Sequence, residues 1–324
     1  MTVADLGEFG LIAAIRAVLP PGAGQVVGIG DDAAVISAPD RRVVATTDLL
    51  VDGVHFRRDW SSAFDIGCKA AAQNLADVAA MGASGTALLA GFATPPDVAA
   101  EWAMDLMRGL AAECARAGAS VAGGDVTRAS TIMLAITALG DLAGRDPVLR
   151  SGARPGDIVA VTGTLGSAAA GLALLQAGLA GNLTEPLAGL VAAHRRPSPP
   201  YPAGPQAAEL GATSLIDISD GLVADLGHVA EASGVQVDID TEQLAASAAV
   251  RAAALREGAL LLGRPDWLGW PLSGGEDHAL AATFPAGTAV PEQWSPIGVV
   301  RAGQGVLVDG QDRADLAGWD HFRG

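Results

Sequence analysis

Residues 42–56 read R-V-V-A-T-T-D-L-L-V-D-G-V-H-F, a β-branched run that carries two hydroxyls and leads into acidic, turn-forming residues. Short apolar runs bounded by Gly, Asp and Pro are typical of strands. Two more precede it, at 26–29 and 33–36. Residues 64–81 then show helical periodicity, and Gly82 is the predicted helix stop. The segment therefore predicts strands with acidic turns followed by a helix.

The alternation of strands and helices continues on both sides of this segment. The other predicted elements are a helix over 1–19, a strand at 86–92, a helix at 97–117, strands at 119–123, 131–139 and 158–162, an Ala-rich helix at 166–180, a strand at 213–218, a helix at 221–233, a strand at 235–239, a helical stretch at 242–257, and strands at 279–284 and 296–308. Turn formers dominate 140–157, and the prolines at 197–205 are predicted to interrupt the pattern of strands and helices. We expect an α/β (α+β) fold with two mixed domains, 1–145 and 146–324.

Composition narrows the class of protein. The 324 residues are 50% apolar and 17% charged, which is typical of a globular chain large enough for two domains. A formal net charge of -16 argues against binding nucleic acid. No membrane span or secretory signal is evident, and the two cysteines suit a reducing cytoplasm, where we expect the protein.

Lys69 is the only lysine, so a P-loop that ends in Lys-Ser/Thr is excluded. The Gly-rich stretch 161–171 resembles a dinucleotide turn only loosely, because no ribose-binding acid follows at the expected distance, so we expect tight strand-to-helix packing and no Rossmann fold. Any phosphate site must be built in another way.

Acids gather at the predicted strand ends of the first domain. Asp31 and Asp32 lie in G-D-D-A-A-V at 30–35, and Asp48 and Asp52 lie in the segment quoted first, next to the hydroxyls of Thr46 and Thr47. Hard cations prefer such oxygen ligands. Asp and Gly also form ordinary turns, which is the alternative for any one of these acids.

The helix over 69–83 carries one polar stripe. Lys69, Gln73 and Asp77 are four residues apart and share a face, with Asn74 at its edge. A solvated helix face is the usual explanation of such a stripe. Here the flanking residues are nearly all apolar, so we expect a buried stripe that needs polar partners.

Two further motifs combine glycine or serine with aspartate. In G-G-D-V-T-R at 123–128, expected after a short strand, Asp125 is suited to hold a cation on a phosphate, and a plain turn is the alternative. In L-I-D-I-S-D-G-L-V-A-D-L at 215–226, Asp217 and Asp220 flank Ser219 where a strand meets a helix. Capping alone accounts for Ser219, but two neighbouring carboxylates favour a metal.

The last motif, L-S-G-G-E-D-H at 272–278, places Glu276 and Asp277 after two glycines. These acids are able to accept a hydrogen bond from a ligand amine. A plain turn explains this segment equally well.

Taken in order, the motifs resemble the thiamine-monophosphate kinase family over residues 7 to about 322, from G-E-F to W-D-H-F. The stretches that carry the resemblance are G-D-D-A-A-V, T-T-D-L-L-V-D-G-V-H-F, N-L-A-D-V-A-A-M-G-A, G-G-D-V-T-R, R-S-G-A-R-P-G-D, V-T-G-T-L-G, D-I-S-D-G-L and L-S-G-G-E-D-H. The superfamily, which includes aminoimidazole ribonucleotide synthetase and a hydrogenase-maturation protein, uses ATP without a P-loop.

The resemblance implies an enzyme that phosphorylates thiamine monophosphate with ATP as co-substrate, by direct transfer bridged by several Mg²⁺ ions. The magnesium ligands it implies are Asp32, Thr46, Thr47, Asp48, Asp77, Asp125, Asp217 and Asp220, of which Asp48, Asp77 and Asp220 are expected to matter most for catalysis. ATP contacts are implied for Gly124, Asp125, Arg150 and Ser219, and thiamine contacts for His55, Glu276 and Trp319. A homodimer formed by paired N-terminal sheets is implied as well.

One residue departs from the family pattern, because His278 stands where a tyrosine is expected. Two alternative functions stay open at this point. One is another ATP-using synthetase of the superfamily that acts on a purine precursor, and the other is a non-catalytic module that binds Mg-ATP.

Overall fold

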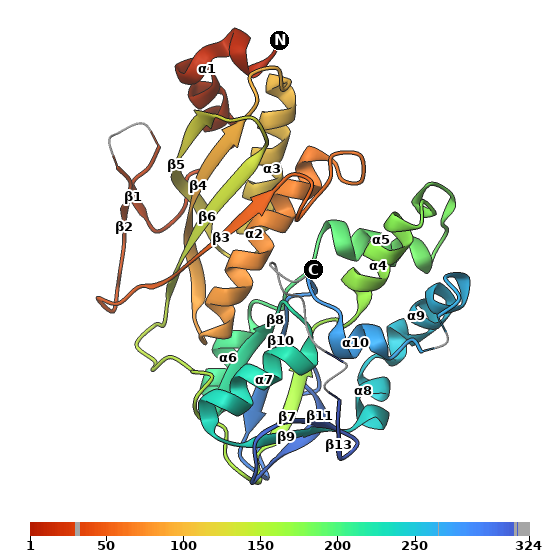
Figure 1. Ribbon diagram of the computed structural model, residues 1–324. Helices are drawn as coiled ribbons and strands as arrows, with labels where there is room; N and C mark the ends of the chain where they lie inside the picture. The colour runs from red at the N-terminus through yellow and green to blue at the C-terminus, as the bar shows by residue number, and fades with distance from the viewer. Residues whose placement is uncertain (30–32, 265, 314–315, 317–324) are drawn as a thin grey trace. The chain divides into compact units, whose positions relative to one another are not determined.

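The computed structural model describes residues 1–29, 33–264, 266–313 and 316. The chain divides into two compact units (Figure 1). Unit 1 comprises Met1–Val78 and Ala83–Gly144, and unit 2 comprises Ala79–Gly82 and Arg145–Gly324. The mixed α/β class expected from the sequence is confirmed.

Unit 1 is built on a four-stranded sheet of order β3-β6-β4-β5, with a separate two-stranded sheet, β1-β2. Its elements are α1 (Val3–Val18), β1 (Gln25–Val27), β2 (Val35–Ile36), β3 (Val44–Val51), α2 (Ala63–Ala80), β4 (Ser84–Thr94), α3 (Ala100–Arg116), β5 (Ser120–Arg128) and β6 (Met133–Asp141). Strand β4 pairs in parallel with β5, and the other two pairings of the four-stranded sheet are antiparallel.

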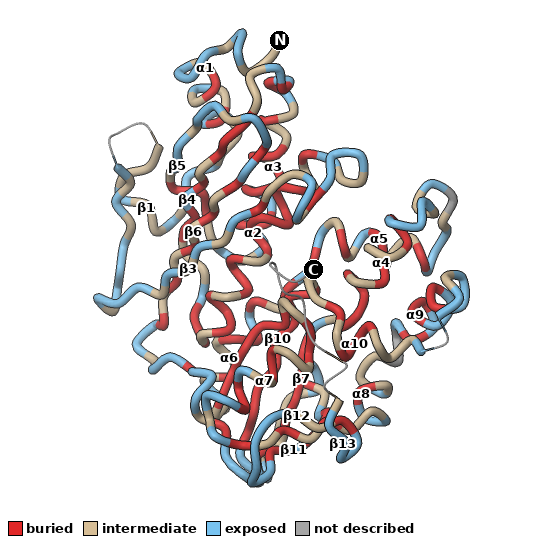
Figure 2. Tube along the Cα trace, in the orientation of Figure 1, coloured by how far each residue is buried: buried red, intermediate tan, exposed pale blue. Residues whose placement is uncertain are grey.

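Helices α2 and α3 pack against one face of this sheet (Figure 1). The contact is apolar, since Leu75 of α2, Leu106 of α3 and Leu134 and Ile136 of β6 are at most 1% exposed. Figure 2 shows buried residues concentrated in these strands and helices. Helix α2 ends where predicted, because Gly82 adopts φ +73° and returns the chain towards β4.

Unit 2 contains a seven-stranded sheet of order β13-β12-β9-β11-β7-β10-β8. Its elements are β7 (Ile158–Thr162), α4 (Ser167–Gln176), η1 (Ala180–Asn182), α5 (Leu187–Arg195), α6 (Ala203–Glu209), β8 (Ser214–Ile218), α7 (Leu222–Ser233), β9 (Gln236–Ile239), α8 (Thr241–Ser247), α9 (Ala249–Leu261), α10 (Gly269–Ser273), β10 (Ala279–Phe284), β11 (Ser295–Arg301), β12 (Gly305–Val308) and β13 (Gln311–Asp312). Among the described strands of this sheet, β12 and β9 pair in parallel and the other pairings are antiparallel.

The core of unit 2 lies between this sheet and α7. Ile216 and Ile218 of β8, Leu226 of α7 and Val237 of β9 belong to one buried cluster. Strand β8 is the edge of the sheet, so the turn from β8 into α7 lies at its margin. Among the described residues, no helix has the length and apolar character that crossing a membrane requires.

Candidate functional site

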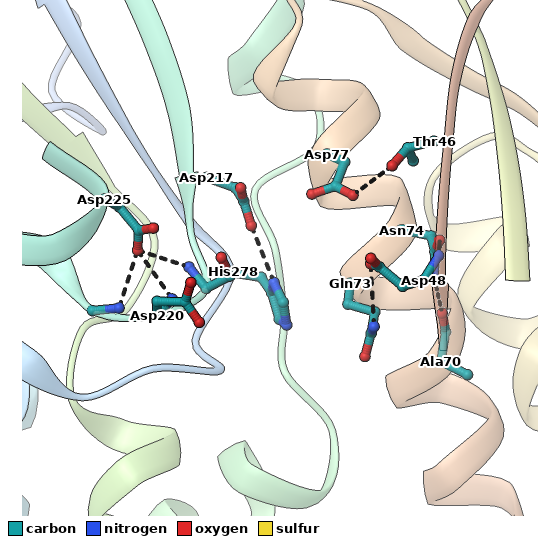
Figure 3. A network of polar contacts seen from close by, with 12 residues as sticks. Thr46, Asp48, Ala70, Gln73, Asn74, Asp77, Asp217, Asp220, Asp225 and His278 are labelled. Carbon is teal, nitrogen blue, oxygen red and sulfur yellow. Dashed lines mark hydrogen bonds and ion pairs between the residues drawn. The ribbon is translucent and has the colours of Figure 1, made fainter. Parts of the chain in front are cut away.

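Strand β3 and helix α2 carry the main cluster of polar side chains in unit 1. The hydroxyl Oγ1 of Thr46 donates a 2.9 Å hydrogen bond to Oδ2 of Asp77, and Nε2 of Gln73 donates to Oδ2 of Asp48 at 3.2 Å (Figure 3). Alternate residues of a strand share a face, so Thr46 and Asp48 both face α2. The structure thus brings together Thr46, Asp48 and Asp77, three of the predicted magnesium ligands.

The side chain of Asn74 positions the backbone of Asp48. Its side chain is fully buried, Oδ1 accepts the Asp48 backbone N–H at 3.0 Å, and Nδ2 donates to the Ala70 carbonyl at 3.0 Å. One side chain therefore fixes the backbone of β3 against α2. The sequence placed Asn74 on the edge of the polar stripe but gave no sign of this role.

The start of the same stripe supports the turn that follows β3. Lys69 is 3% exposed, and its Nζ donates to the His55 carbonyl at 3.2 Å. The ring Nδ1 of His55 accepts the Val51 backbone N–H at 3.1 Å. The prediction of a buried polar stripe on α2 is confirmed for Lys69 and Asn74, whereas Gln73 and Asp77 are partly exposed.

The side chains of two predicted ligands of unit 1 lie on the face of the sheet opposite to α2. Thr47 Oγ1 donates to the Ile136 carbonyl at 3.0 Å, one residue out of phase with Asp48. Asp125 is exposed and shares a cross-strand row with Leu49, so its side chain also points away from α2. Within unit 1, the structure does not gather the side chains of Thr47 and Asp125 with the Thr46, Asp48 and Asp77 group.

The G-G-D-V-T-R motif lies in a strand, and the expectation that it follows a short strand was wrong. Strand β5 continues to Arg128 because it pairs with β4 along its whole length. A Cβ atom on Gly124 would lie 2.0 Å from the carbonyl oxygen of Ala90, so only glycine permits this approach. Gly124 consequently has a packing role, whether or not it contacts a nucleotide.

In unit 2, Asp225 organises the turn between β8 and α7. Its Oδ2 accepts the backbone N–H groups of Ser219, Asp220 and Gly221 at 3.1, 3.1 and 3.0 Å (Figure 3). Burial, together with the charges of Asp217 and Asp220, raises the pKa of Asp225 to about 7.

The capping role expected for Ser219 was wrong. The N-cap of α7 is Gly221, which has no side chain to cap the helix, and the carboxylate one turn later satisfies the N–H groups instead. The sequence signal for Asp225 was its position in D-G-L-V-A-D, four residues after Gly221.

His278 bears directly on Asp217. The two side chains are buried, and His278 Nδ1 lies 3.3 Å from Asp217 Oδ2 (Figure 3). The residue that departs from the family pattern therefore contacts a predicted magnesium ligand.

The loop that contains Glu276 and Asp277 joins three elements. Asp277 Oδ2 and Oδ1 accept the N–H groups of Gly166 and Ala168 at 2.6 and 3.0 Å at the start of α4. Burial raises the pKa of Asp277 to about 7 in spite of these two donors. Asp277 is thus committed to a helix end and is not available for a ligand amine. Glu276 is about one third exposed and contacts His194.

The remaining predicted residues are less informative. Arg150 is exposed, and its carbonyl accepts a hydrogen bond from Ser233. Asp32 and Trp319 lie outside the described residues. Within the ranges that the structure describes, no three His, Cys, Asp or Glu side chains lie in an arrangement that holds a metal ion. The ligand set inferred from the family resemblance therefore stays a prediction.

Comparison with known proteins covers the whole chain. Residues 30–142 match the family model "AIR synthase related protein, N-terminal domain". A thiamine-monophosphate kinase of Mycobacterium tuberculosis is 47% identical over 99% of this chain and 93% of its own length.

Solved structures agree with this match. The thiamine-monophosphate kinase of Stenotrophomonas maltophilia K279a superposes with a TM-score of 0.80 at 35% identity, covering 96% of this chain and 98% of that one. A structure described as "AaThiL complexed with AMPPCP and TMP" superposes with a TM-score of 0.78 at 32% identity over 99% of both chains. The chain belongs to the thiamine-monophosphate kinase family of enzymes.

Proposed function

We propose that this chain transfers the γ-phosphoryl group of ATP to the phosphate of thiamine monophosphate, forming thiamine diphosphate. The observation that carries the proposal is the end-to-end similarity to the structure described with AMPPCP and TMP, over 99% of both chains. AMPPCP is an ATP analogue whose β–γ bridge is a methylene group. The polar groups on β3, on α2 and after β8 lie in motifs that carry the family resemblance.

The donor set suits Mg²⁺. Thr46, Asp48 and Asp77 supply hydroxyl and carboxylate oxygens in unit 1, and Asp217 and Asp220 supply carboxylates in unit 2. Hard divalent cations prefer such oxygens over nitrogen or sulfur. These residues, together with Asp32, Thr47 and Asp125, are our proposed magnesium ligands, as the family resemblance implies. When bound, magnesium ions supply the positive charge that lets two anionic phosphates approach.

The protein itself supplies position. The acceptor is a phosphate oxygen that is already anionic near neutral pH, so the transfer needs no general base. Asn74 fixes the backbone of Asp48, and Thr46 fixes the carboxylate of Asp77, so neither acid has to reorganise during the reaction. The transfer is proposed to be in line, with Asp48, Asp77 and Asp220 as its most important acids.

The nucleotide and thiamine contacts are assigned by the same resemblance. We assign ATP contacts to Gly124, Asp125, Arg150 and Ser219. The Ser219 N–H already donates to Asp225, so its hydroxyl is the donor proposed for the nucleotide. We assign the thiamine end to His55, Glu276 and Trp319.

The open face of the unit 1 sheet supports a homodimer. Leu49, Leu89 and Met133 are 53%, 36% and 36% exposed on the side opposite to α2 and α3. Clustered exposed apolar side chains of this kind are typical of protein contacts. Leu49→Arg is expected to convert a dimer into a monomer, as measured by light scattering on a sizing column.

A cytoplasmic location and the absence of nucleic-acid partners stay predictions.

One experiment tests the activity. The chain is incubated with ATP and thiamine monophosphate, and thiamine diphosphate is measured by chromatography with and without a chelator. Product that forms only when divalent cations are present is expected. Parallel reactions with a phosphorylated purine precursor test the synthetase alternative, and binding of ATP without turnover of any acceptor would contradict the proposal.

A further inference from the structure

Glu276 has an unusual backbone for its residue type. Its φ angle is +66°, in the left-handed region that favours glycine, although glycines precede it at 274 and 275. The conformation is held on both sides, since the Glu276 N–H donates to the Ser219 carbonyl at 2.8 Å and the His278 N–H donates to the Ile218 carbonyl at 2.9 Å. A residue other than glycine costs about 1 kcal/mol or more in such a place. A carboxylate retained at this cost is a candidate for a functional role.

A second helix reaches the same carboxylate. His194, in the last turn of α5, is 5% exposed, and its Nδ1 lies 3.3 Å from Glu276 Oε2. The Glu276 side chain keeps 35% of its surface exposed. One end of the pair is therefore anchored in the protein interior and the other end reaches solvent.

Close helix packing fixes the histidine. A Cβ atom on Gly171 of α4 would lie 2.1 Å from the Leu190 carbonyl oxygen and 3.1 Å from the His194 Cβ. Helices α4 and α5 therefore approach closely at the position of His194. The same helix α4 begins at the N–H groups held by Asp277, the next residue after Glu276. Helices α4 and α5 and the Glu276 loop are thus packed and hydrogen-bonded together within unit 2.

We propose that His194 is a positioning residue that holds the Glu276 carboxylate as the acceptor for the exocyclic amine of the thiamine pyrimidine. The proposal rests on the proposed function, and it deepens that function by naming a specificity determinant of the same site. An acid in a fixed backbone still samples several side-chain rotamers, and contact with a buried imidazole selects one of them. His194 therefore governs selectivity for amine-bearing acceptors and leaves the phosphoryl transfer itself unchanged.

Substitutions that remove or keep the Nδ1 contact provide the test. His194→Leu removes the contact at similar volume, and His194→Asn keeps a polar nitrogen near the position of Nδ1. His228→Leu is the matched control, because His228 lies on α7 of the same unit and is exposed. Each variant is assayed with thiamine monophosphate and with oxythiamine monophosphate, which carries a carbonyl group in place of the amine.

We expect His194→Leu to raise the KM for thiamine monophosphate roughly tenfold, because the Glu276 carboxylate loses the buried imidazole contact that selects its rotamer, with kcat and the KM for ATP unchanged. Preference for thiamine monophosphate over the oxo analogue should shrink by a similar factor. His194→Asn should restore both values, and His228→Leu should match the wild type. A purely structural role would lower kcat and thermal stability in both His194 variants without changing the preference, and that result would overturn the proposal.

Failure of the proposed function can be told apart from failure of this inference. If the wild type is active and His194→Leu retains its KM and its preference, only the inference fails. If the wild type does not turn over thiamine monophosphate, calorimetric titration with that compound decides. Weaker binding by His194→Leu than by His228→Leu then supports the inference, and equal or undetectable binding overturns it.

Discussion

The Thr46 hydroxyl donates a 2.9 Å hydrogen bond to the Asp77 carboxylate. This bond joins strand β3 to helix α2 within the cluster of polar side chains in unit 1. The two residues are 31 positions apart in the chain and belong to different motifs of the sequence. Their contact makes the orientation of Asp77 depend on β3, and this dependence can be measured.

Asp77→Asn tests the acid directly. The amide keeps the size of the side chain but removes its negative charge, so turnover at saturating magnesium should fall at least tenfold, roughly 1.4 kcal/mol in the barrier. Asp105→Asn, on the exposed side of α3, should retain wild-type turnover. A smaller loss in the Asp77 variant would contradict a direct role.

Thr46→Val tests the orientation of that acid. Valine preserves the shape of threonine but cannot donate to Asp77, so the half-saturating magnesium concentration should rise several-fold. The free energy of unfolding, measured with urea, should change by less than about 1 kcal/mol. Thr46→Ser should behave like the wild type. Equal magnesium dependence in the valine and serine variants would refute the coupling.

Asn74→Leu tests the support of β3. The change leaves the Asp48 N–H without its side-chain partner in a part-buried place and removes the Asn74 amide from the Ala70 carbonyl, so the free energy of unfolding should fall by roughly 1–3 kcal/mol. Urea denaturation measures the loss. Stability equal to the wild type would show that water or another group satisfies the Asp48 N–H.

Gly124→Ala separates packing from nucleotide contact. The added methyl group would lie 2.0 Å from the Ala90 carbonyl oxygen, so β5 must shift and the melting temperature should fall by several degrees. The control is Gly227→Ala, because Gly227 lies within α7 and an added Cβ meets nothing within 4 Å. That change should stabilise slightly, since alanine favours helix.

Asp277 predicts how stability depends on pH. Its pKa is raised from 3.8 to about 7 by burial, so the folded protein binds a proton that the unfolded chain releases, and its contribution to stability decreases as pH rises from about 4 to 7. The charges of His278 and Arg251 lower this pKa but do not cancel the effect of burial.

The comparison with Asp277→Asn isolates this effect. The variant is expected to be less stable than the wild type at pH 5, because its amide accepts only one of the two helix N–H groups. The gap should narrow by roughly 1 kcal/mol for each pH unit between pH 5 and pH 7. Urea denaturation across that range measures it, and parallel curves would contradict the raised pKa.

Strands and helices with strong patterns were predictable from sequence. The runs 158–162 and 279–284 coincide with β7 and β10, because each is a continuous apolar segment bounded by turn formers. The stripe of Lys69, Gln73 and Asp77 was identified for the same reason, since its apolar flanks show that the helix is buried.

Other features depend on partners far away in the chain, which periodicity does not reveal. Strand β5 extends through two glycines because β4 pairs with it. Helix α6 starts among the prolines of 197–205, where Pro202 occupies the N-cap and Pro205 the first turn, positions that need no N–H donor. The contact between His194 and Glu276 joins residues 82 positions apart, and no local signal marks it.

The burial of Lys69 has a practical consequence. Because no other lysine exists in the sequence and this one is 3% exposed with its amine on the His55 carbonyl, an acylating reagent can modify a lysine side chain only when α2 separates from the turn after β3. The rate of Lys69 acylation, followed by mass spectrometry, is therefore a built-in reporter of local opening in unit 1.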